Sequence, residues 1–295
     1  MTDIPRIATP ARTHAIMERF GFHTKKHLGQ NFLTNLDVLS GIVAAAGVDE
    51  HSDVIEIGPG IGSLTQYLAE AAHQVLALEI DEALLPVLDE TMAPYPNVTV
   101  ENQDVLTANL RALIEQHFDG QHSVKVVANL PYYITTPILM HLMQIDIDFE
   151  SITVMMQGEV ADRLTAQPGS KDYSSLSIAI QNQMTVQVAF TVNRRSFVPA
   201  PNVDSAIIVL QRRAEPLADV DDQAGFNRLV RGSFASRRKT LWNNLQQLYG
   251  KDADTKAAMT AALADSDIAP GLRAERLSIT DFARLFNSLQ KQHVA

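Results

Sequence analysis

Short apolar runs and amphipathic helical patterns alternate along the first two thirds of the chain. The apolar runs are rich in Val, Ile and Leu, as buried strands are, and they read DVIEIG, HQVLALEID, NVTVENQD, SVKVVANL and SITVMMQ. Helical patterns such as SLTQYLAEAA separate most of them. Because parallel strands need crossover connections, this order predicts an α/β fold with a doubly wound, mostly parallel sheet and helices on both faces.

Two later apolar stretches predict a different element at the edge of this sheet. MTVQVAFTV and SAIIVLQRR flank the segment NRRSFVPAPNVD, which is rich in turn-forming residues. We expect the two stretches to form an antiparallel hairpin.

The pattern changes again beyond AEPLADVDDQAG, where only capped helical patterns remain. We place a domain boundary near Glu215 to Gln223. This predicts a catalytic domain over residues 31–214 and a small all-α domain over residues 215–295.

The segment before Gly29 has little apolar periodicity and several basic residues, namely Arg12, Arg19, Lys25 and Lys26. We expect residues 1–30 to form a mobile basic arm that becomes ordered when ligands bind. The stretch GQNFL then leads into a helix whose start is indicated by Thr34, with Asp37 as a weak capping-box match.

The composition narrows the class of protein. The 295 residues include no cysteine, which excludes disulfides and thiolate metal sites and fits a cytoplasmic location. We find no signal peptide and no apolar run long enough to span a membrane. The nine histidines match no metal-ligand spacing, so we expect no metal.

The formal net charge of −10 hides a strong segregation of charge. The segment from Phe226 to Leu245 carries five basic residues and no acid, whereas Glu79 to Asp119 is acidic with Arg111 as its only base. A basic run alone is typical of a solvated helix face, and it also suits a nucleic-acid phosphate backbone.

A glycine-rich turn follows the first strand in EIGPGIGSLT, from Glu56 to Thr65. Glycines let the backbone turn sharply and let a ligand approach the amides at a helix start. The dinucleotide fingerprint requires glycines at 58, 60 and 63, but position 63 is Ser63 and the third glycine is Gly62. The spacing therefore favours a smaller ligand than a dinucleotide.

Two acidic residues end the next two strands. Glu79 lies about twenty residues beyond the glycines, where a carboxylate can accept hydrogen bonds from ribose hydroxyls. It could instead cap a helix, a role that Asp81 could also fill. Asp104, next to Val105 and Leu106, could accept from an exocyclic amino group or could be an ordinary turn residue.

The run VKVVANLPYY ends a buried strand with Asn129-Leu130-Pro131-Tyr132. In the expected strand order, Asn129 emerges beside the glycine turn, at the switch point where such sheets bind ligands. Its amide oxygen and the carbonyl of Leu130 or Pro131 can accept two N–H groups, and Tyr132 offers a ring for stacking. Two acceptors and a ring suit an amino group attached to an aromatic base. Hydrogen bonds to both acceptors favour a pyramidal amino nitrogen, whose lone pair can then attack without the help of a strong base.

These features together resemble the class I S-adenosylmethionine-dependent N6-adenine methyltransferases, and more narrowly the 16S ribosomal RNA adenine dimethyltransferases of the KsgA type. The motifs that carry the narrower resemblance are KKHLGQNFL, EIGPGIGSLT, NLPYYITTPIL, GEVADRL, PGSKDYSSLSI, FVPAPNVDSAII and SRRKTLWNNL. They extend from about Lys25 to Phe286, and the departures from the family pattern are Gly158 and Trp242.

The resemblance implies a Rossmann-like fold, S-adenosyl-L-methionine as cofactor and a set of site residues. The cofactor-binding residues that it implies are Asn31, Leu33, Gly58, Gly60, Glu79, Asp104 and Asn129. The catalytic residues that it implies are Asn129, Leu130, Pro131, Tyr132 and Phe197. Among these, Tyr132 and Phe197 would sandwich the target base, and Asn129 would face its amino group.

The resemblance further implies two methyl groups on each of two adjacent adenosines, in the loop of the 3′-terminal helix of 16S rRNA. The partner would be the small ribosomal subunit or its precursor, bound by a monomer without metal or membrane. The RNA-binding residues that we expect are Lys25, Lys26, Arg228, Arg231, Arg237, Arg238 and Lys239.

Three alternatives remain at this point. A 23S rRNA methyltransferase of the macrolide-resistance type is disfavoured by the long carboxy-terminal domain and by SRRKTLWNNL. A non-catalytic ribosome assembly factor is disfavoured by the intact glycine turn and NLPY. A NAD dehydrogenase is disfavoured by Ser63.

Overall fold

The computed structural model describes residues 4–21 and 31–294, which form two compact units. The first unit comprises Met1–Ala161 and Gln187–Arg212, and the second comprises Asp162–Val186 and Arg213–Ala295. The described helices include none that is long and apolar enough to cross a membrane.

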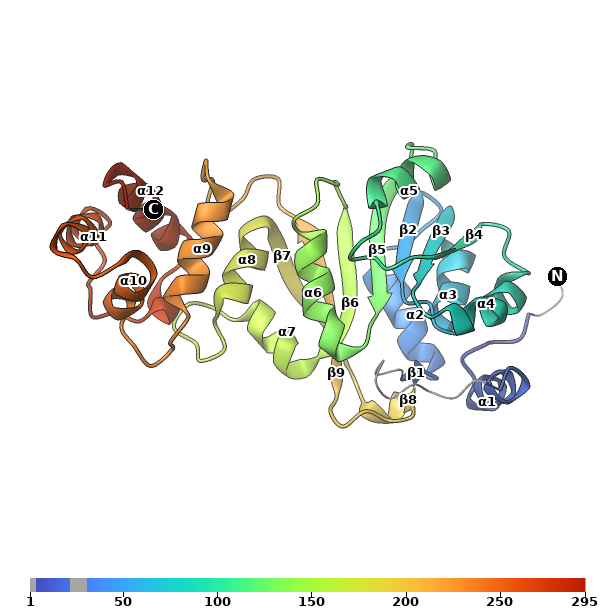
Figure 1. Ribbon diagram of the computed structural model, residues 1–295. Coiled ribbons are helices and arrows are strands. Elements are labelled where there is room, and N and C mark those ends of the chain that lie inside the picture. Colours follow the sequence, from blue (N-terminus) through green and yellow to red (C-terminus); the bar gives the residue numbers. More distant parts are fainter. Residues whose placement is uncertain (1–3, 22–30, 295) are drawn as a thin grey trace. The chain divides into compact units, whose positions relative to one another are not determined.

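A seven-stranded sheet with the order β4-β3-β2-β5-β6-β9-β7 forms the centre of the first unit (Figure 1). Its strands are β2 (Ser52–Ile57), β3 (Gln74–Glu79), β4 (Val98–Asn102), β5 (Ser123–Asn129), β6 (Ser151–Gln157), β7 (Met184–Val192) and β9 (Ser205–Arg212). The strands from β4 to β6 pair in parallel, and β9 is antiparallel to β6. This confirms the doubly wound sheet with its antiparallel edge.

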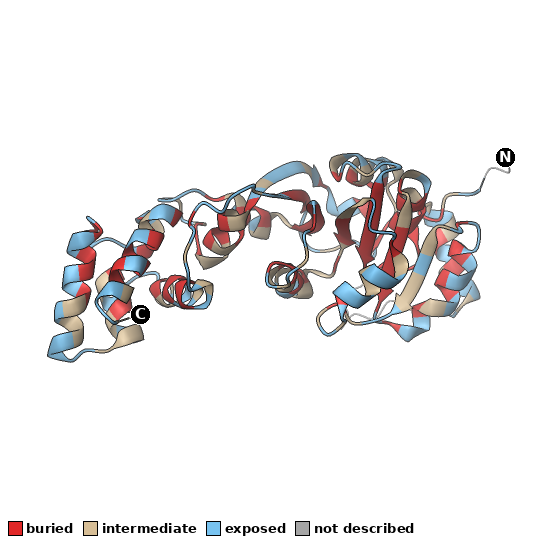
Figure 2. Cartoon of the chain, turned by 90° about the horizontal axis from the view of Figure 1, so that it is seen from above, coloured by how far each residue is buried: buried red, intermediate tan, exposed pale blue. Residues whose placement is uncertain are grey.

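The order of β3, β2 and β5 creates the switch point that the sequence predicted. Ile57 of β2 pairs with Leu78 of β3 on one side and with Ala128 of β5 on the other. The chain leaves β2 at Gly58 and β5 at Asn129, so these two residues emerge side by side. Central strands are buried on both faces, which explains their continuous runs of Val, Ile and Leu (Figure 2).

The remaining elements of the first unit cover the sheet or connect its strands. They include α2 (Leu36–Ala45), α3 (Ser63–Ala71), η2 (Glu82–Leu84), α4 (Leu85–Met92), α5 (Leu110–His117), α6 (Tyr132–Leu142), η3 (Arg194–Ser196) and the start of α7 (Gly158–Thr165). Leu39 of α2 and Leu68 of α3 pack with Val54 and Val127 of the sheet in one buried cluster. These two helices therefore cover one face of the sheet.

The start of α2 differs from the sequence prediction. The cap is Asn35 rather than Thr34, because Asn35 Oδ1 accepts hydrogen bonds from the amides of Asp37 at 3.1 Å and Val38 at 3.2 Å. The Thr34 amide instead donates to the carbonyl of Ser196 at 2.8 Å. This bond ties the segment before α2 to the segment before Phe197.

The expected lack of apolar anchoring is wrong for residues 4–21. They include the helix α1 (Pro10–Arg19), and Ile7 and Ile16 are buried in a cluster with Val87 and Leu88 of α4. Residues 22–30, with Lys25 and Lys26, lie outside the described residues.

The second unit is formed by helices. Besides the end of α7 and the start of β7, it contains α8 (Ser175–Gln183), α9 (Gln223–Ser233), α10 (Leu241–Tyr249), α11 (Ala253–Asp265), η4 (Ala274–Arg276) and α12 (Ile279–Lys291). Its core includes Phe226 and Phe286, whose rings pack edge to face with centroids 5.9 Å apart. Trp242, one of the two departures from the family pattern, packs against this core.

The limits of this unit differ from the boundary expected near Glu215. Tyr173 and Ile178, which precede that boundary, are buried in the same core as Phe226. The segment Asp162–Val186 therefore belongs to the helical unit, although the sequence places it between strands of the sheet. Local pattern could not reveal this, because the packing partners lie far away in the sequence.

Candidate active site

A cavity of about 230 Å³ opens at the carboxyl ends of the central strands. Every cofactor-binding and catalytic residue predicted from the sequence lines it, namely Asn31, Leu33, Gly58, Gly60, Glu79, Asp104, Asn129, Leu130, Pro131, Tyr132 and Phe197. The fold thus brings together residues from the amino-terminal segment, the carboxyl ends of four parallel strands and the segment before β9. Their individual roles remain predictions.

The glycine turn after β2 forms one wall of this cavity. Gly58, Gly60 and Gly62 have φ angles of +72°, +61° and +88°, which side chains rarely adopt. A Cβ atom at Gly62 would also lie 2.5 Å from Cε of Met92. Glycine is therefore required here both by the backbone and by the close approach of α4.

Glu79 holds the glycine turn against the end of β3. Its carboxylate accepts one hydrogen bond from the Gly60 amide at 3.1 Å and another from the Asp81 amide at 2.8 Å. Burial raises the pKa of Glu79, and these two hydrogen bonds oppose the rise. Asp81 accepts from the Ala83 amide at 3.1 Å and so caps η2, which leaves Glu79 without a capping role there.

Asp104 lies in the turn after β4 with its carboxyl group at the cavity wall. Its Oδ1 accepts from the Leu106 amide at 2.9 Å, and its carbonyl accepts from the Thr107 amide at 3.0 Å. The residue is therefore a turn aspartate as well as a cavity residue. The two interpretations of the sequence are compatible, because the turn fixes the carboxyl group in place.

Asn129, the last residue of β5, lies at the cavity, and α6 begins three residues later at Tyr132. The Pro131 carbonyl accepts from the Ile134 amide and from the Thr135 hydroxyl, both at 3.1 Å. These two bonds use both of its lone pairs. Of the two carbonyls considered from the sequence, that of Leu130 is therefore the available second acceptor.

Two contacts orient the aromatic residues at the cavity. The Tyr132 hydroxyl lies 2.8 Å from the hydroxyl of Ser205, which fixes the ring through its far end. Phe197 belongs to β8 (Phe197–Val198), which pairs with β1 (Phe32–Leu33) so that Leu33 lies opposite Phe197. Phe197 is only 4% exposed, although its sequence context suggests a loop.

Glu56 is a cavity residue that the sequence interpretation missed. It lies within β2, is 1% exposed, and its Oε2 has no hydrogen-bond partner among the described residues. Burial raises the pKa of Glu56 to about 8; the Thr65 side chain opposes this rise, and the charge of Glu79 adds a smaller effect in the same direction as burial. An acidic residue inside the apolar run DVIEIG was the available signal.

Replacing Glu56 with glutamine is expected to change the pH dependence of stability. The pKa is 4.5 in its ordinary state and about 8 in the folded protein, so this carboxyl group weakens the fold progressively as the pH rises between these values. Glutamine cannot ionise. Between about pH 5 and pH 7, the variant should gain about 2.5 kcal/mol in unfolding free energy relative to the wild type.

Urea denaturation at several pH values measures this difference. The matched control is Glu115→Gln, since Glu115 is exposed on α5 and its replacement should leave the difference constant across the range. A Glu56→Gln curve parallel to the wild-type curve would show that the carboxyl group does not retain its proton in the folded state.

The predicted basic helix is two helices joined by a turn. Arg228 and Arg231 lie on α9, whereas Arg237, Arg238 and Lys239 follow its end at Ser233 and precede α10. All five side chains are exposed. The turn interrupts the helix because Thr240, whose hydroxyl accepts from the Asn243 amide at 3.3 Å, begins a new one.

Two members of this basic set already donate hydrogen bonds to the protein itself, and the first is Arg231, whose Nε donates to the carbonyl of Asn227 at 3.3 Å. The second is Arg237, which donates hydrogen bonds to the carbonyl of Lys171 and, at 3.2 Å, to that of Tyr173. No hydrogen bond or ion pair engages the side chains of Arg238 and Lys239 within the described ranges. These two are therefore better candidates for phosphate contacts than Arg237.

The cavity fits a nucleoside that carries a short charged chain. At Gly60 a Cβ atom would lie 3.4 Å from the Phe32 ring, so the missing side chain leaves backbone exposed for close approach. Carboxylates of Glu79 and Asp104 provide acceptors for hydroxyl and amino groups, and the lining is otherwise largely apolar. These are the groups that S-adenosylmethionine requires.

Comparisons with known proteins agree with this geometry. Residues 21–291 match the family model described as ribosomal RNA adenine dimethylase. The chain is 56% identical to ribosomal RNA small subunit methyltransferase A of Ligilactobacillus salivarius, over 99% of both chains. The corresponding protein of Enterococcus faecalis is 53% identical, again over 99% of both chains.

Two solved structures are also similar. A dimethyladenosine transferase from Plasmodium falciparum has a TM-score of 0.73 and 26% identity, covering 88% of this chain and 98% of its own. The 23S rRNA methyltransferase ErmE has a TM-score of 0.66 and 30% identity, covering 88% of this chain and all of its own. The chain therefore belongs to the ribosomal RNA adenine dimethylase family and is an S-adenosylmethionine-dependent methyltransferase.

Proposed function

We propose that this protein transfers methyl groups to N6 of two adjacent adenosines in the 3′-terminal helix loop of 16S rRNA, two on each base. The observation that carries the proposal is the convergence of Asn129, Tyr132 and Phe197 beside the glycine turn in one cavity. The relatives at 53–57% identity bear the name of a small-subunit rRNA methyltransferase, which favours that RNA over the 23S RNA named for ErmE.

The cofactor S-adenosylmethionine supplies a methyl group activated by a positively charged sulfur. In the proposed arrangement, the Glu79 carboxylate accepts from the ribose hydroxyls and that of Asp104 accepts from the adenine amino group. Gly58 and Gly60 allow close approach of the methionine portion. Asn31 and Leu33 cover the cavity beside Phe197, to which β1 connects them.

The target adenine would be held by the aromatic residues and activated by two acceptors. Tyr132 and Phe197 would stack on its two faces, while Asn129 Oδ1 and the Leu130 carbonyl accept its N6 hydrogens. These bonds favour a pyramidal nitrogen, so its lone pair can attack before a proton leaves. The base must leave its stack to reach this position, which costs less in a loop than in a duplex.

Incubation of the protein with labelled S-adenosylmethionine and small subunits that lack these methyl groups tests the proposal. We expect label in dimethyladenosine at two adjacent positions near the 3′ end of the RNA. Label in the large-subunit RNA would favour the 23S alternative. Absence of label, with binding to the subunit retained, would favour a non-catalytic assembly factor.

We further propose that the protein acts as a monomer in the cytoplasm, on the 30S subunit or its precursor. The proposed substrate is assembled in that compartment, and the absence of cysteine from the sequence suits it. The overall negative charge would limit indiscriminate RNA binding and leave recognition to the basic segment.

The double variant Arg238→Ala/Lys239→Ala is expected to weaken binding to the small subunit and to flatten its salt dependence. Each lost phosphate contact should reduce the slope of log K against log salt by about one. The affinity for the cofactor alone should not change. Binding measured at several salt concentrations provides the slope.

Arg237→Ala is the comparison variant, because Arg237 already donates to backbone carbonyls of the second unit. We expect Arg237→Ala to lower the melting temperature and to change the slope of log K against log salt less than Arg238→Ala/Lys239→Ala does. An unchanged slope for Arg238→Ala/Lys239→Ala would mean that these side chains belong to an ordinary solvated surface.

A further inference from the structure

Three segments of the first unit meet at the amino-terminal edge of the sheet, at the opposite end of the strands from the cavity. Asp53 lies at the start of β2, His73 immediately precedes β3, and His122 immediately precedes β5. Five residue steps along β2 separate Asp53 from Gly58, which is about 17 Å of extended chain. The cluster is therefore distinct from the methyltransferase site.

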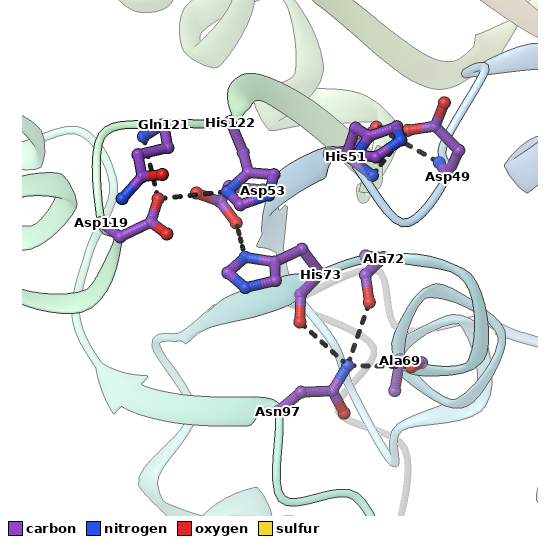
Figure 3. Close-up of polar contacts among 11 residues, drawn as sticks. Asp49, His51, Asp53, Ala69, Ala72, His73, Asn97, Asp119, Gln121 and His122 are labelled. Carbon is purple, nitrogen blue, oxygen red and sulfur yellow. Dashed lines mark hydrogen bonds and ion pairs between the residues drawn. The ribbon is translucent and has the colours of Figure 1, made fainter.

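The three side chains are in close contact (Figure 3). Nδ1 of His73 lies 2.8 Å from Oδ1 of Asp53. The imidazole rings of His73 and His122 stack with their centroids 3.9 Å apart and their planes at 17°. One possible ligand atom from each of the three residues lies within 4.8 Å of the other two.

The Asp53 carboxylate is only half satisfied. Its side chain is 0% exposed, and its Oδ2 has no hydrogen-bond partner among the described residues. A buried carboxylate without compensation is costly, and Figure 3 shows this one beside both imidazole rings. A simple Asp–His pair would account for Oδ1 but not for Oδ2 or for the second imidazole.

The surrounding backbone holds the two histidines in place. The Asn97 side chain donates to the carbonyls of Ala69 at 2.9 Å and His73 at 3.4 Å, which fixes the connection between α3 and β3. Asp119 Oδ1 lies 3.1 Å from Nδ1 of His122. Carboxylates that orient histidines in this way are typical of the surroundings of metal ligands.

We propose that Asp53, His73 and His122 bind one divalent transition-metal ion of the Zn²⁺ class, with water in a fourth position. Two imidazoles and one carboxylate suit Zn²⁺, whereas Mg²⁺ and Ca²⁺ prefer oxygen ligands. The ion satisfies Oδ2 of Asp53, and His73 can present a lone pair to it by moving its proton to the other ring nitrogen.

Binding requires only a local contraction. Ligand atoms around a tetrahedral Zn²⁺ lie about 3.4 Å apart, whereas those of Asp53, His73 and His122 lie within 4.8 Å of one another. The longest of these separations must therefore shorten, and the two imidazole rings must tilt apart. The side chains of His73 and His122 are 33% and 20% exposed, which leaves the ion a route from solvent. The bound ion ties together the starts of β2, β3 and β5 and so stabilises this edge of the sheet.

Calorimetric titration of the metal-stripped, untagged full chain with ZnCl₂ tests the proposal. We expect one ion per chain with a dissociation constant below about 10 μM, and a melting temperature that rises with added Zn²⁺. MgCl₂ in large excess should not displace it. Co²⁺ in place of Zn²⁺ should give the visible absorption of a tetrahedral site.

His122→Ala should weaken Zn²⁺ binding at least tenfold and remove the Co²⁺ spectrum. The matched control is His117→Ala, because His117 also pairs with a carboxylate, that of Glu101 at 3.1 Å, but has no second histidine recorded beside it in the described ranges. Asp53→Asn, which keeps the side-chain shape, is the second variant in case His122→Ala folds poorly, and it should weaken Zn²⁺ binding similarly. A wild-type dissociation constant above about 10 μM overturns the proposal. The proposal also fails if His122→Ala or Asp53→Asn binds Zn²⁺ as tightly as the control His117→Ala.

Discussion

Replacement of Asn129 by alanine is expected to lower the rate of methyl transfer at least about 1,000-fold, about 4 kcal/mol in the activation barrier. The amide oxygen of Asn129 would accept a hydrogen from the nitrogen that reacts, and this bond strengthens as the nitrogen becomes pyramidal. The Leu130 carbonyl cannot replace it, because it accepts the other N6 hydrogen. The effect therefore falls on the transition state rather than on cofactor binding.

Two measurements separate these effects. Cofactor affinity by calorimetry should fall by less than about tenfold, while single-turnover transfer to the small subunit nearly disappears. Asn287→Ala, at an exposed position of α12, is the control for loss of an asparagine away from the cavity. Turnover of Asn129→Ala within about tenfold of the wild type would sink the assignment of Asn129 as a catalytic residue.

Replacement of Glu79 by alanine is expected to weaken cofactor binding about 100-fold, about 2.7 kcal/mol. The carboxylate would accept from two ribose hydroxyls, and hydrogen bonds to charged groups are stronger than neutral ones. The same carboxylate accepts from the Gly60 amide, so the variant also loosens the glycine turn that contacts the ligand. Both effects act in the same direction.

Two companion variants sharpen this test. Glu79→Gln retains one acceptor oxygen and should lose less affinity than Glu79→Ala. Glu82→Ala removes an exposed carboxylate of η2 only a few residues away and should bind the cofactor like the wild type. If Glu79→Ala binds within about threefold of the wild type, the carboxylate is a structural support of the turn rather than a ligand for the ribose.

The structure distinguishes two neighbouring basic residues that look alike in the sequence. Arg237 and Arg238 are adjacent, and both were expected to bind RNA. The structure shows Arg237 donating to backbone carbonyls near Tyr173, whereas Arg238 has no such contact recorded within the described ranges. Only the path of the segment around Tyr173 distinguishes them, and that path depends on the core around Phe226.

The sequence by itself determined the elements whose causes are local. Alternating apolar runs and helical patterns indicated the parallel sheet, because each strand needs residues that suit burial on both faces. The glycines at 58, 60 and 62 were visible as a turn because no other residue adopts their backbone angles readily. The end of β5 was visible because Pro131 fixes a turn directly after Asn129.

Tertiary structure decided every feature that depends on residues distant in sequence. Leu33 and Phe197 pair at the cavity although most of the catalytic unit separates them in the sequence, and no local pattern indicates this pairing. The raised pKa of Glu56 comes from burial by the surrounding strands and helices. Asp53, His73 and His122 show no metal-binding spacing, yet the parallel strands bring them together at one edge of the sheet. Strand order sets these distances, and strand order is fixed by packing between segments rather than within them.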